Sequence, residues 1–308
     1  LCAVADNMSR RHFNNIGEAY LQIGLESAPC KGNCVFCVFA AKNGFIRERT
    51  KYSKEEVVRK TLEAEKDKPS GIVLMITCTY DFEEFLEVGN AVYNSVSHDI
   101  PIVANIPDFN YSQAMQLVDA GFSAIFHVVR INEGIDTTFS VEQRIATVEA
   151  AKQAGLAIQA CVDPLGIEHT VKQQVENMFL QKELGYYFSG VSIRIPVPKS
   201  PLAHYGQVPY WYAARTTAVS RLVMGTTVTG HCVHETNIPC LLAGANVIWA
   251  EVGSNPRDAN KETEKGRGFS IKKSQEILRE TGWDIRVGPS PTSMGPAWFR
   301  RKQAEGLT

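Results

Sequence analysis

A (β/α)8 barrel of the TIM type, an α/β fold, is predicted by three features of this 308-residue chain. Short apolar runs alternate with amphipathic stretches along most of the sequence, an order typical of parallel α/β folds. Most of the runs are rich in Val, Ile and Leu and show little alternation, as in parallel strands covered by helices. Several amphipathic stretches end at a glycine, as helices often do. The number of units favours a closed barrel, and a doubly wound open sheet is the alternative.

The expected elements follow one another in regular order. Apolar runs predict eight strands, at residues 21–27, 71–77, 101–106, 123–129, 156–161, 190–196, 226–230 and 246–250. Amphipathic stretches predict helices at residues 81–93, 111–120, 141–154, 170–184, 210–224 and 237–243. A further helix is expected to begin after Ser53 and to run toward residue 64, because Ser53 and Glu56 have the spacing of a capping box.

Three segments are expected along the chain. Residues 1–20 form a leading segment and residues 21–255 form the barrel. Residues 256–308 form a C-terminal cap, which is polar and rich in Gly and Pro apart from one helix at 271–279. A chain of this length can bury a substantial core.

Composition and charge exclude several classes of protein. Hydrophobic residues make up 44% of the chain, charged residues make up 21%, and the formal net charge is −1. Such a balance gives no bulk attraction to nucleic acid or to an anionic membrane, and no apolar run approaches the ~18 residues of a membrane span. The eight cysteines do not suit a secreted disulfide scaffold of this size. We therefore expect a cytoplasmic protein with a metal site built from clustered thiols.

Three of the cysteines form a triplet just after the first predicted strand. Cys30, Cys34 and Cys37 have Cys-x3-Cys-x2-Cys spacing, so their thiolates can surround one metal centre. Structural zinc and most complete iron–sulfur clusters use four protein ligands. A triplet instead leaves one iron of a [4Fe–4S] cluster open to another molecule. The alternatives are a zinc loop and three buried free thiols.

This spacing, with the aromatic Phe36 directly before the third cysteine, resembles the radical S-adenosylmethionine (radical SAM) superfamily. Two further segments resemble its biotin synthase-like branch, which includes biotin synthase, the [FeFe]-hydrogenase maturase of this type and methylornithine synthase. They are Leu-Leu-Ala-Gly-Ala-Asn-Val-Ile-Trp at 241–249 and Pro-Lys-Ser-Pro-Leu-Ala at 198–203. The resemblance covers most of residues 20–255, and the triplet is its most specific part.

The resemblance implies an enzyme that holds a [4Fe–4S] cluster and binds SAM at the open iron. An electron from a flavodoxin-type or ferredoxin-type donor would cleave SAM, and the adenosyl radical would abstract hydrogen from a small substrate in the barrel. Sulfur insertion, as in biotin and lipoyl synthases, is the expected outcome. The alternatives are radical rearrangement, C–C cleavage or metallocofactor maturation in the same branch. A non-catalytic zinc or electron-transfer protein is the alternative from a different class.

Polar side chains after the fourth predicted strand are candidates for binding SAM, since barrel sites lie at the carboxyl ends of strands. Arg130 is suited to a bidentate contact with the SAM carboxylate. Asn132, Glu133 and Asp136 are candidates for the ribose hydroxyls. The alternative is a surface cluster of salt bridges.

Three further candidates lie on other strand ends. Glu168 follows the fifth strand, where the resemblance implies the adenine side of the site, although an acid in a first helical turn is also favoured by the helix dipole. Arg194 lies within the sixth strand and is expected to have a partner there. Thr77 ends the second strand, where many family members carry a Gly-Gly-Glu-type segment that binds the SAM amino group. This chain lacks that segment, so Thr77 or backbone carbonyls would replace it.

An auxiliary cluster is the last candidate site. Biotin synthase holds a second, [2Fe–2S] cluster by three cysteines and an arginine, and Cys78 and Cys161 match the positions of two of these ligands. Strand three has Asn105 in place of a cysteine. Cys232 and His234, or His231 beside them, would complete an unusual site, since imidazole can replace thiolate on iron. The alternative is a set of buried free cysteines.

Overall fold

The predicted closed barrel is confirmed by a computed structural model, which describes residues 1–306 apart from residues 98, 235, 259 and 261. Strand β1 pairs in parallel with β11 and with β4, and β10 pairs with β9, so that the ring closes. The ring strands, in chain order, are β1 (Ile16–Gly24), β4 (Gly71–Met75), β5 (Ile102–Asn105), β6 (Phe122–Phe126), β7 (Ala157–Gln159), β9 (Phe188–Ile193), β10 (Gly230–His234) and β11 (Val247–Gly253). Strand β8 (Val162–Leu165) follows β7 and also pairs with β9.

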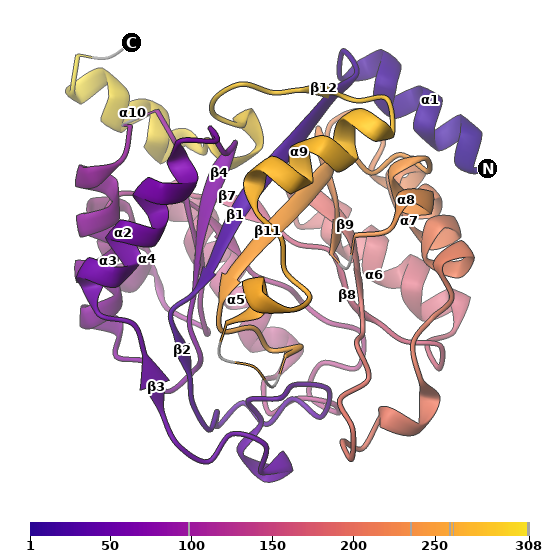
Figure 1. The fold of residues 1–308 in the computed structure, drawn as a ribbon, viewed down its shortest axis with the longest axis horizontal. Helices are drawn as coiled ribbons and strands as arrows, with labels where there is room; N and C mark the ends of the chain where they lie inside the picture. Colours follow the sequence, from indigo (N-terminus) through magenta and orange to yellow (C-terminus); the bar gives the residue numbers. More distant parts are fainter. Residues whose placement is uncertain (98, 235, 259, 261, 307–308) are drawn as a thin grey trace.

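Helices cover the outside of the barrel (Figure 1). They are α2 (Lys54–Glu65), α3 (Phe82–Ser95), α4 (Tyr111–Asp119), α5 (Val141–Ala154), α6 (Val171–Glu183), α7 (Tyr210–Met224) and α8 (Ile238–Leu241). The capping box is confirmed, because the Ser53 side chain accepts a hydrogen bond from Glu56 N while the Glu56 side chain accepts one from Ser53 N. The bounds of α5 and α7 agree with those predicted, since regular patterns and clear end signals mark both.

The largest errors in the predicted strand bounds lie at the seventh and first strands. The seventh ring strand was expected at 226–230 but begins at Gly230. Val228 and Thr229 precede it, and their carbonyls accept hydrogen bonds from the buried guanidinium of Arg221. This β-branched run therefore forms a loop around Arg221 and not the predicted strand. The first strand begins at Ile16 rather than at residue 21, and helix α1 (Cys2–His12) precedes it within the leading segment.

Within its described residues, the C-terminal segment holds two α-helices rather than the single one expected. Helix α9 (Ile271–Glu280) matches the prediction, and α10 (Pro296–Ala304) follows strand β12 (Asp284–Ile285), which pairs with β1. Only Ala297 and Lys302 of α10 are buried, so this helix has no apolar stripe by which it could be recognised.

Side chains from this segment close the amino end of the barrel. The hydroxyl of Tyr20 lies 2.9 Å from Thr292 Oγ1 and 2.7 Å from Ser293 Oγ, and Gln159 Nε2 donates to Ser293 Oγ at 2.6 Å. Above them the interior is filled by aromatic rings, including Trp249 stacked on Tyr20 at 5.9 Å between centroids. The carboxyl end of the ring is therefore the end left for a site.

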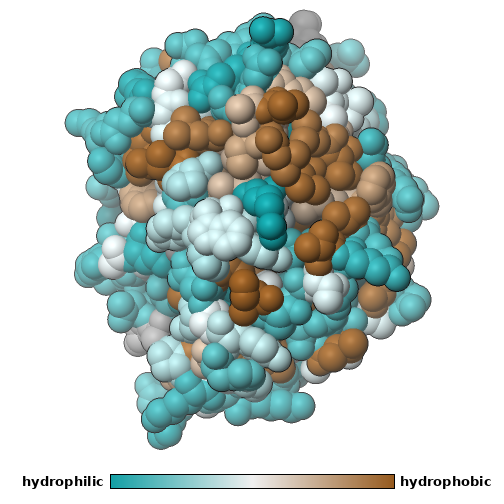
Figure 2. Space-filling model, turned by 90° about the vertical axis from the view of Figure 1, so that its right-hand side faces the viewer, coloured by the Kyte–Doolittle hydropathy of each residue, from teal (hydrophilic) through white to brown (hydrophobic). Residues whose placement is uncertain are grey.

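The outer surface carries exposed apolar side chains near the N-terminal helix. Val4, Ile238 and Leu242 are exposed on or beside α1 and α8, and the side of the molecule that carries these helices is shown in Figure 2. In the part of the chain that the structure describes, no helix combines the length and the apolar character needed to cross a bilayer.

Candidate metal and cofactor site

The cysteine triplet lies in the loop between two short antiparallel strands, β2 (Glu26–Ser27) and β3 (Thr50–Lys51), beyond the carboxyl ends of the ring strands (Figure 1). Backbone hydrogen bonds fix this loop to other parts of the rim. Val35 N donates to Asp136 O at 2.9 Å, and Val38 N donates to Pro256 O at 2.9 Å. Cys30 N also donates to Phe39 O at 2.6 Å, which folds the loop back on itself. The cysteine backbones are thus held before any metal binds.

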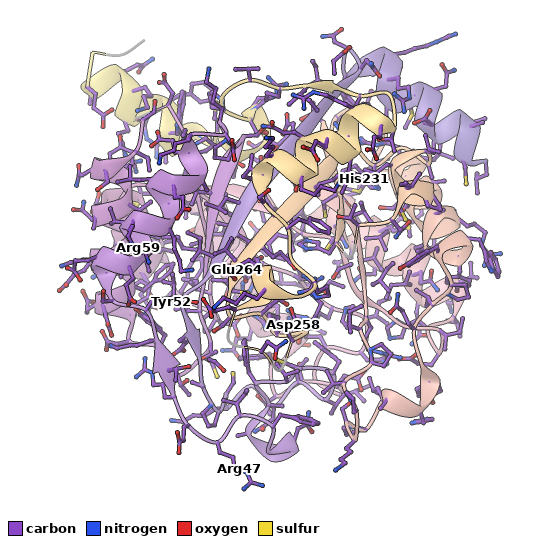
Figure 3. The ribbon with its side chains drawn as sticks, viewed as in Figure 1. Arg47, Tyr52, Arg59, His231, Asp258 and Glu264 are labelled. Carbon is purple, nitrogen blue, oxygen red and sulfur yellow. The ribbon has the colours of Figure 1, made fainter. Side chains whose placement is uncertain are left out.

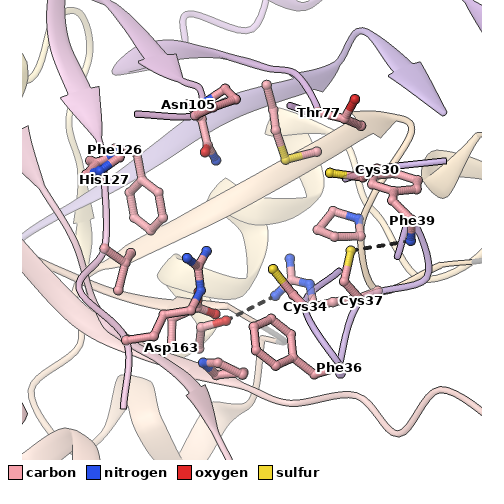
Figure 4. Close-up of a pocket in the computed structure, with 18 of the residues that line it drawn as sticks. Cys30, Cys34, Phe36, Cys37, Phe39, Thr77, Asn105, Phe126, His127 and Asp163 are labelled. Atoms are coloured by element: carbon pink, nitrogen blue, oxygen red, sulfur yellow. Dashed lines mark hydrogen bonds and ion pairs between the residues drawn. The ribbon is translucent and has the colours of Figure 1, made fainter. Parts of the chain in front are cut away.

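All three thiols face one cavity at the mouth of the barrel (Figure 4). Cys37 Sγ accepts a hydrogen bond from Phe39 N at 3.3 Å. Contact with the Cys78 thiol lowers the pKa of Cys30 to about 6, whereas burial raises the pKa of Cys34 to about 11 and raises that of Cys37 further. Among the described residues, the three thiol sulfurs do not gather within 4.8 Å of one another. That spread suits a cubane, in which each thiolate binds a different iron.

Cys78 was predicted to be a ligand of the auxiliary site, but it lies beside the triplet instead. Its sulfur lies 3.0 Å from Cys30 Sγ and accepts a hydrogen bond from Gly32 N at 3.1 Å. Two thiolates on separate irons of a cluster stand farther apart than this contact. The position of Cys78 therefore suits a hydrogen-bond partner of Cys30 better than a ligand at a corner of its own.

The cavity wall combines polar and apolar groups from most of the ring. Apolar and aromatic side chains include Phe36, Phe39, Met75, Ile106, Phe126 and Phe139. Polar side chains include Gln22, Thr77, Asn105, His127, Arg130, Arg144, Asp163, Ser192, Arg194, His234 and Arg257. A concave wall of this kind, where polar groups converge among apolar side chains, is typical of a small-molecule site.

Arg130 reaches the cavity beside the triplet. Its Nε lies 3.3 Å from Asp163 Oδ2, and its guanidinium carbon lies 5.8 Å from the centroid of the Phe36 ring (Figure 4). Burial opposes the charge, but Asp163 and Glu133 raise the pKa of Arg130 above its ordinary value. The side chain is therefore a permanent cation held by carboxylates at the cavity wall.

The polar run after the fourth strand curls into a turn. Glu133 is buried, accepts a hydrogen bond from Arg130 N at 3.0 Å and lies 3.6 Å from Arg144 Nε. Asn132, with a positive φ of 59°, donates to Asp136 Oδ2 at 3.2 Å. Of these four residues, all of them described, only Arg130 lines the cavity. Ribose binding by the other three stays a prediction, since their side chains here hold the turn together.

Arg194 and Glu168 are brought together as an ion pair. Arg194 Nη2 donates to Glu168 Oε2 at 2.8 Å, and Arg194 lines the cavity. Burial opposes ionisation of Glu168, but Arg194 holds its pKa below the ordinary value. Thr77 is buried, lines the cavity and donates its hydroxyl hydrogen to Glu26 Oε1. Arg194 and Thr77 thus both lie at the mouth of the barrel, as predicted.

A charged group at the cavity wall was missed in the sequence. His127 Nε2 lies 3.0 Å from Asp108 Oδ1, and Arg144 Nη1 donates to the same oxygen at 3.2 Å. Burial lowers the pKa of His127. His127 directly follows β6 and was within reach of the strand-end rule, whereas Arg144 comes from a helix and carries no such signal.

A second cluster of possible metal ligands lies deeper. The ligand atoms of Cys161, Cys232 and His234 all lie within 4.8 Å of one another, and all three residues are buried. Cys232 and His234 are two residues apart on β10, so they share one face of the strand. His231 faces the other way, with its Nε2 3.2 Å from Thr217 O on α7. Figure 3 shows His231 far from Arg47, which lies on the loop after the triplet.

Comparison with known proteins agrees with this geometry. No family model matches the chain. The biotin synthase of Pelotomaculum thermopropionicum is 27% identical over 257 residues, which cover 77% of this chain and 78% of that protein. The biotin synthase of Desulforudis audaxviator is 25% identical over 249 residues, which cover 73% of each chain.

Solved structures share the fold. Methylornithine synthase (PylB) superposes with a TM-score of 0.74, covering 100% of this chain and 90% of that chain at 16% identity. The FeFe-hydrogenase maturase HydG from Carboxydothermus hydrogenoformans gives a TM-score of 0.73 over 92% of this chain and 70% of that chain, also at 16% identity. The chain is thus similar in sequence to biotin synthases and similar in fold to HydG and PylB.

Proposed function

We propose that the chain is a radical SAM enzyme of the biotin synthase-like kind, which cleaves S-adenosylmethionine reductively and abstracts hydrogen from a small molecule bound in the barrel. The observation that supports this most is the arrangement of the triplet, with three thiols on one cavity wall beside Arg130 and Phe36. The three thiols fit a [4Fe–4S] cluster with one open iron, because their sulfurs are spread and none shares a site with an imidazole or carboxylate among the described residues.

Cys30, Cys34 and Cys37 would hold the cluster, which supplies the one-electron cleavage of SAM and a carbon radical strong enough to abstract hydrogen. The electron would come from a low-potential carrier of flavodoxin or ferredoxin type. Arg130 would pair with the carboxylate of SAM, while Thr77 and the backbone at the end of β4 would accept hydrogen bonds from its amino group. The apolar side chains of the wall would keep water from the reacting carbon atoms.

Arg194 and its partner Glu168 would form the opposite side of the SAM site. Arg194 Nε is buried and has no hydrogen-bond partner among the described residues. A buried donor without a partner is unfavourable, so this N–H is available to an oxygen atom of a bound molecule. Ion pairing with Glu168 fixes the direction of the guanidinium and orients that donor.

Sulfur insertion is the finer prediction for the reaction. It requires a sulfide donor near the substrate, and Cys161, Cys232 and His234 are the group that would have to carry one. Radical rearrangement, C–C cleavage and metallocofactor maturation need no such donor. Counting acid-labile sulfide separates them: about four per chain indicates the triplet cluster alone, and clearly more indicates a donor cluster.

Anaerobic reconstitution tests the proposed function. The chain is incubated with iron and sulfide, reduced with dithionite and given SAM, and 5′-deoxyadenosine is measured. We expect the product only when reductant is present, and the same sample without dithionite is the control. A protein that binds its iron but never yields 5′-deoxyadenosine would overturn the proposal.

A further inference from the structure

The buried group of Cys161, Cys232 and His234 differs from the triplet in the spacing of its ligand atoms. A single tetrahedral ion with metal–sulfur bonds of 2.3 Å places its two sulfurs about 3.8 Å apart. All three ligand atoms here already lie within 4.8 Å of one another. The group is therefore spaced for one ion rather than for thiolates on separate irons.

His234 has the environment of a metal-binding imidazole. Its Nδ1 lies 3.6 Å from Glu251 Oε1, and its Nε2 is buried with no hydrogen-bond partner in the described structure. Histidines that bind metals commonly hydrogen-bond a carboxylate through the other ring nitrogen, which fixes the tautomer and the ring orientation. An imidazole that contacts the Cys232 thiol and keeps a buried Nε2 without a conventional hydrogen bond is a second sign that this position serves a ligand.

Glu251 is itself held in place. Its Oε2 lies 2.6 Å from Arg267 Nη1, and its Oε1 forms an ion pair with Arg257. Burial opposes its ionisation, but Arg257, His234 and Arg267 hold the pKa of Glu251 below the ordinary value. A carboxylate fixed by two arginines can orient His234 without moving to bind the metal.

The residues do not fit the four-ligand [2Fe–2S] cluster of biotin synthase. Asn105 stands where the third strand would supply a cysteine, and Cys78 lies beside Cys30 instead of joining Cys161. Two sulfurs and one nitrogen remain. Three protein ligands with one open position are the donor set of a mononuclear metal site.

We propose that Cys161, Cys232 and His234 bind one divalent transition-metal ion, with Glu251 as the positioning residue for His234. Zn2+ and Fe2+ are the candidates, since thiolate and imidazole ligands suit both. His234 lines the cavity, so the open coordination position would take a heteroatom of the molecule bound there. This inference does not depend on cleavage of SAM, and it favours the reactions that need no sulfide donor over sulfur insertion.

The test uses the full-length chain with Cys30, Cys34 and Cys37 changed to Ala, so that the triplet cannot bind metal. The anaerobic, metal-free protein is titrated with Co2+, and absorption and bound cobalt are measured. We expect about one Co2+ per chain, with the intense visible bands of tetrahedral cobalt bound to thiolate. Adding Cys232→Ala should abolish these bands, and adding Cys240→Ala, a buried cysteine on α8, should leave them unchanged.

A second variant and a second metal protect the test against misfolding. His234→Gln, checked by circular dichroism, should keep the fold and lose tight Co2+ binding. Cobalt binding that survives both Cys232→Ala and His234→Gln would overturn the proposal. So would reconstitution of the triplet-free chain with about two irons and two sulfides, because that stoichiometry belongs to a [2Fe–2S] cluster.

Discussion

The two thiol groups of this barrel differ in how the chain supports them. The triplet lies in a loop, partly exposed, with its thiols spread along the wall of a cavity and its backbone tied to the rim. Cys161, Cys232 and His234 are buried, lie on or just after ring strands and stand close together. The spread thiols of the loop suit a cluster of several irons, whereas the closely spaced ligand atoms of the buried group suit a single ion. The difference in support thus corresponds to a difference in what each group can bind.

The largest effect is expected from Cys34→Ala. This change removes one of three thiols from the triplet, so the chain should lose about four irons and all 5′-deoxyadenosine formation. Iron content and product are measured after anaerobic reconstitution, with Cys240→Ala as the matched control. If the variant keeps its iron and still cleaves SAM, the triplet is not the cluster site and the contrast between the two groups collapses.

Glu251→Gln tests the deeper group. Losing the carboxylate that orients His234 should weaken Co2+ binding in the triplet-free chain about 10–100-fold, as is usual for outer-shell carboxylates. The affinity is measured by competition with a chelator. Glu18→Gln is the control, because Glu18 is also buried and its Oε1 lies 2.6 Å from Arg286 Nε. Equal losses in both variants would show a general effect on stability instead of positioning.

Arg130→Lys tests the triplet side of the cavity. Lysine keeps the charge but lacks the planar fork of arginine, so the SAM concentration for half-maximal cleavage should rise about tenfold, as expected for loss of one charged hydrogen bond. Arg47→Lys, at an exposed position on the loop after the triplet, should leave it unchanged (Figure 3). An unaltered SAM requirement in Arg130→Lys would remove Arg130 from the SAM site.

The smallest effect is expected from Cys78→Ala. As a hydrogen-bond partner of Cys30, Cys78 contributes about 1 kcal/mol, so cleavage should fall about fivefold or less and the iron count should stay the same. Iron loss as large as that in Cys34→Ala would instead show that Cys78 is a fourth ligand and that no iron is left open.

The barrel could be predicted because the signals that define it are local. Apolar runs and glycine ends fall within a few residues, as at Val141–Ala154, whose helix was placed correctly. Helix α10 could not be predicted, since it is held by hydrogen bonds such as that from the Arg300 guanidinium to Ala154 O and not by an apolar stripe. The strand that begins at Gly230 was predicted too early in the sequence. The residues before it form a loop around the buried Arg221, and the sequence pattern gives no sign of that contact.

The site was predictable in part for the same reason. The triplet was found from its spacing, and Thr77, Arg130 and Arg194 from their places on predicted strands together with the family resemblance; all of them line the cavity. Which cysteines stand together depends on strand register and loop path, so Cys78 was assigned to the deeper group although it contacts Cys30. Arg144 and Asp108 meet His127 only through tertiary folding, and no spacing in the sequence reveals that contact.

The hydroxyl-rich floor under Tyr20, in which Thr292, Ser293 and Gln159 are joined by hydrogen bonds, closes the amino end of the barrel. A molecule that passes the cysteine loop and reaches this floor can extend no further toward the amino end. The floor thus limits the length of substrate that the described cavity can enclose.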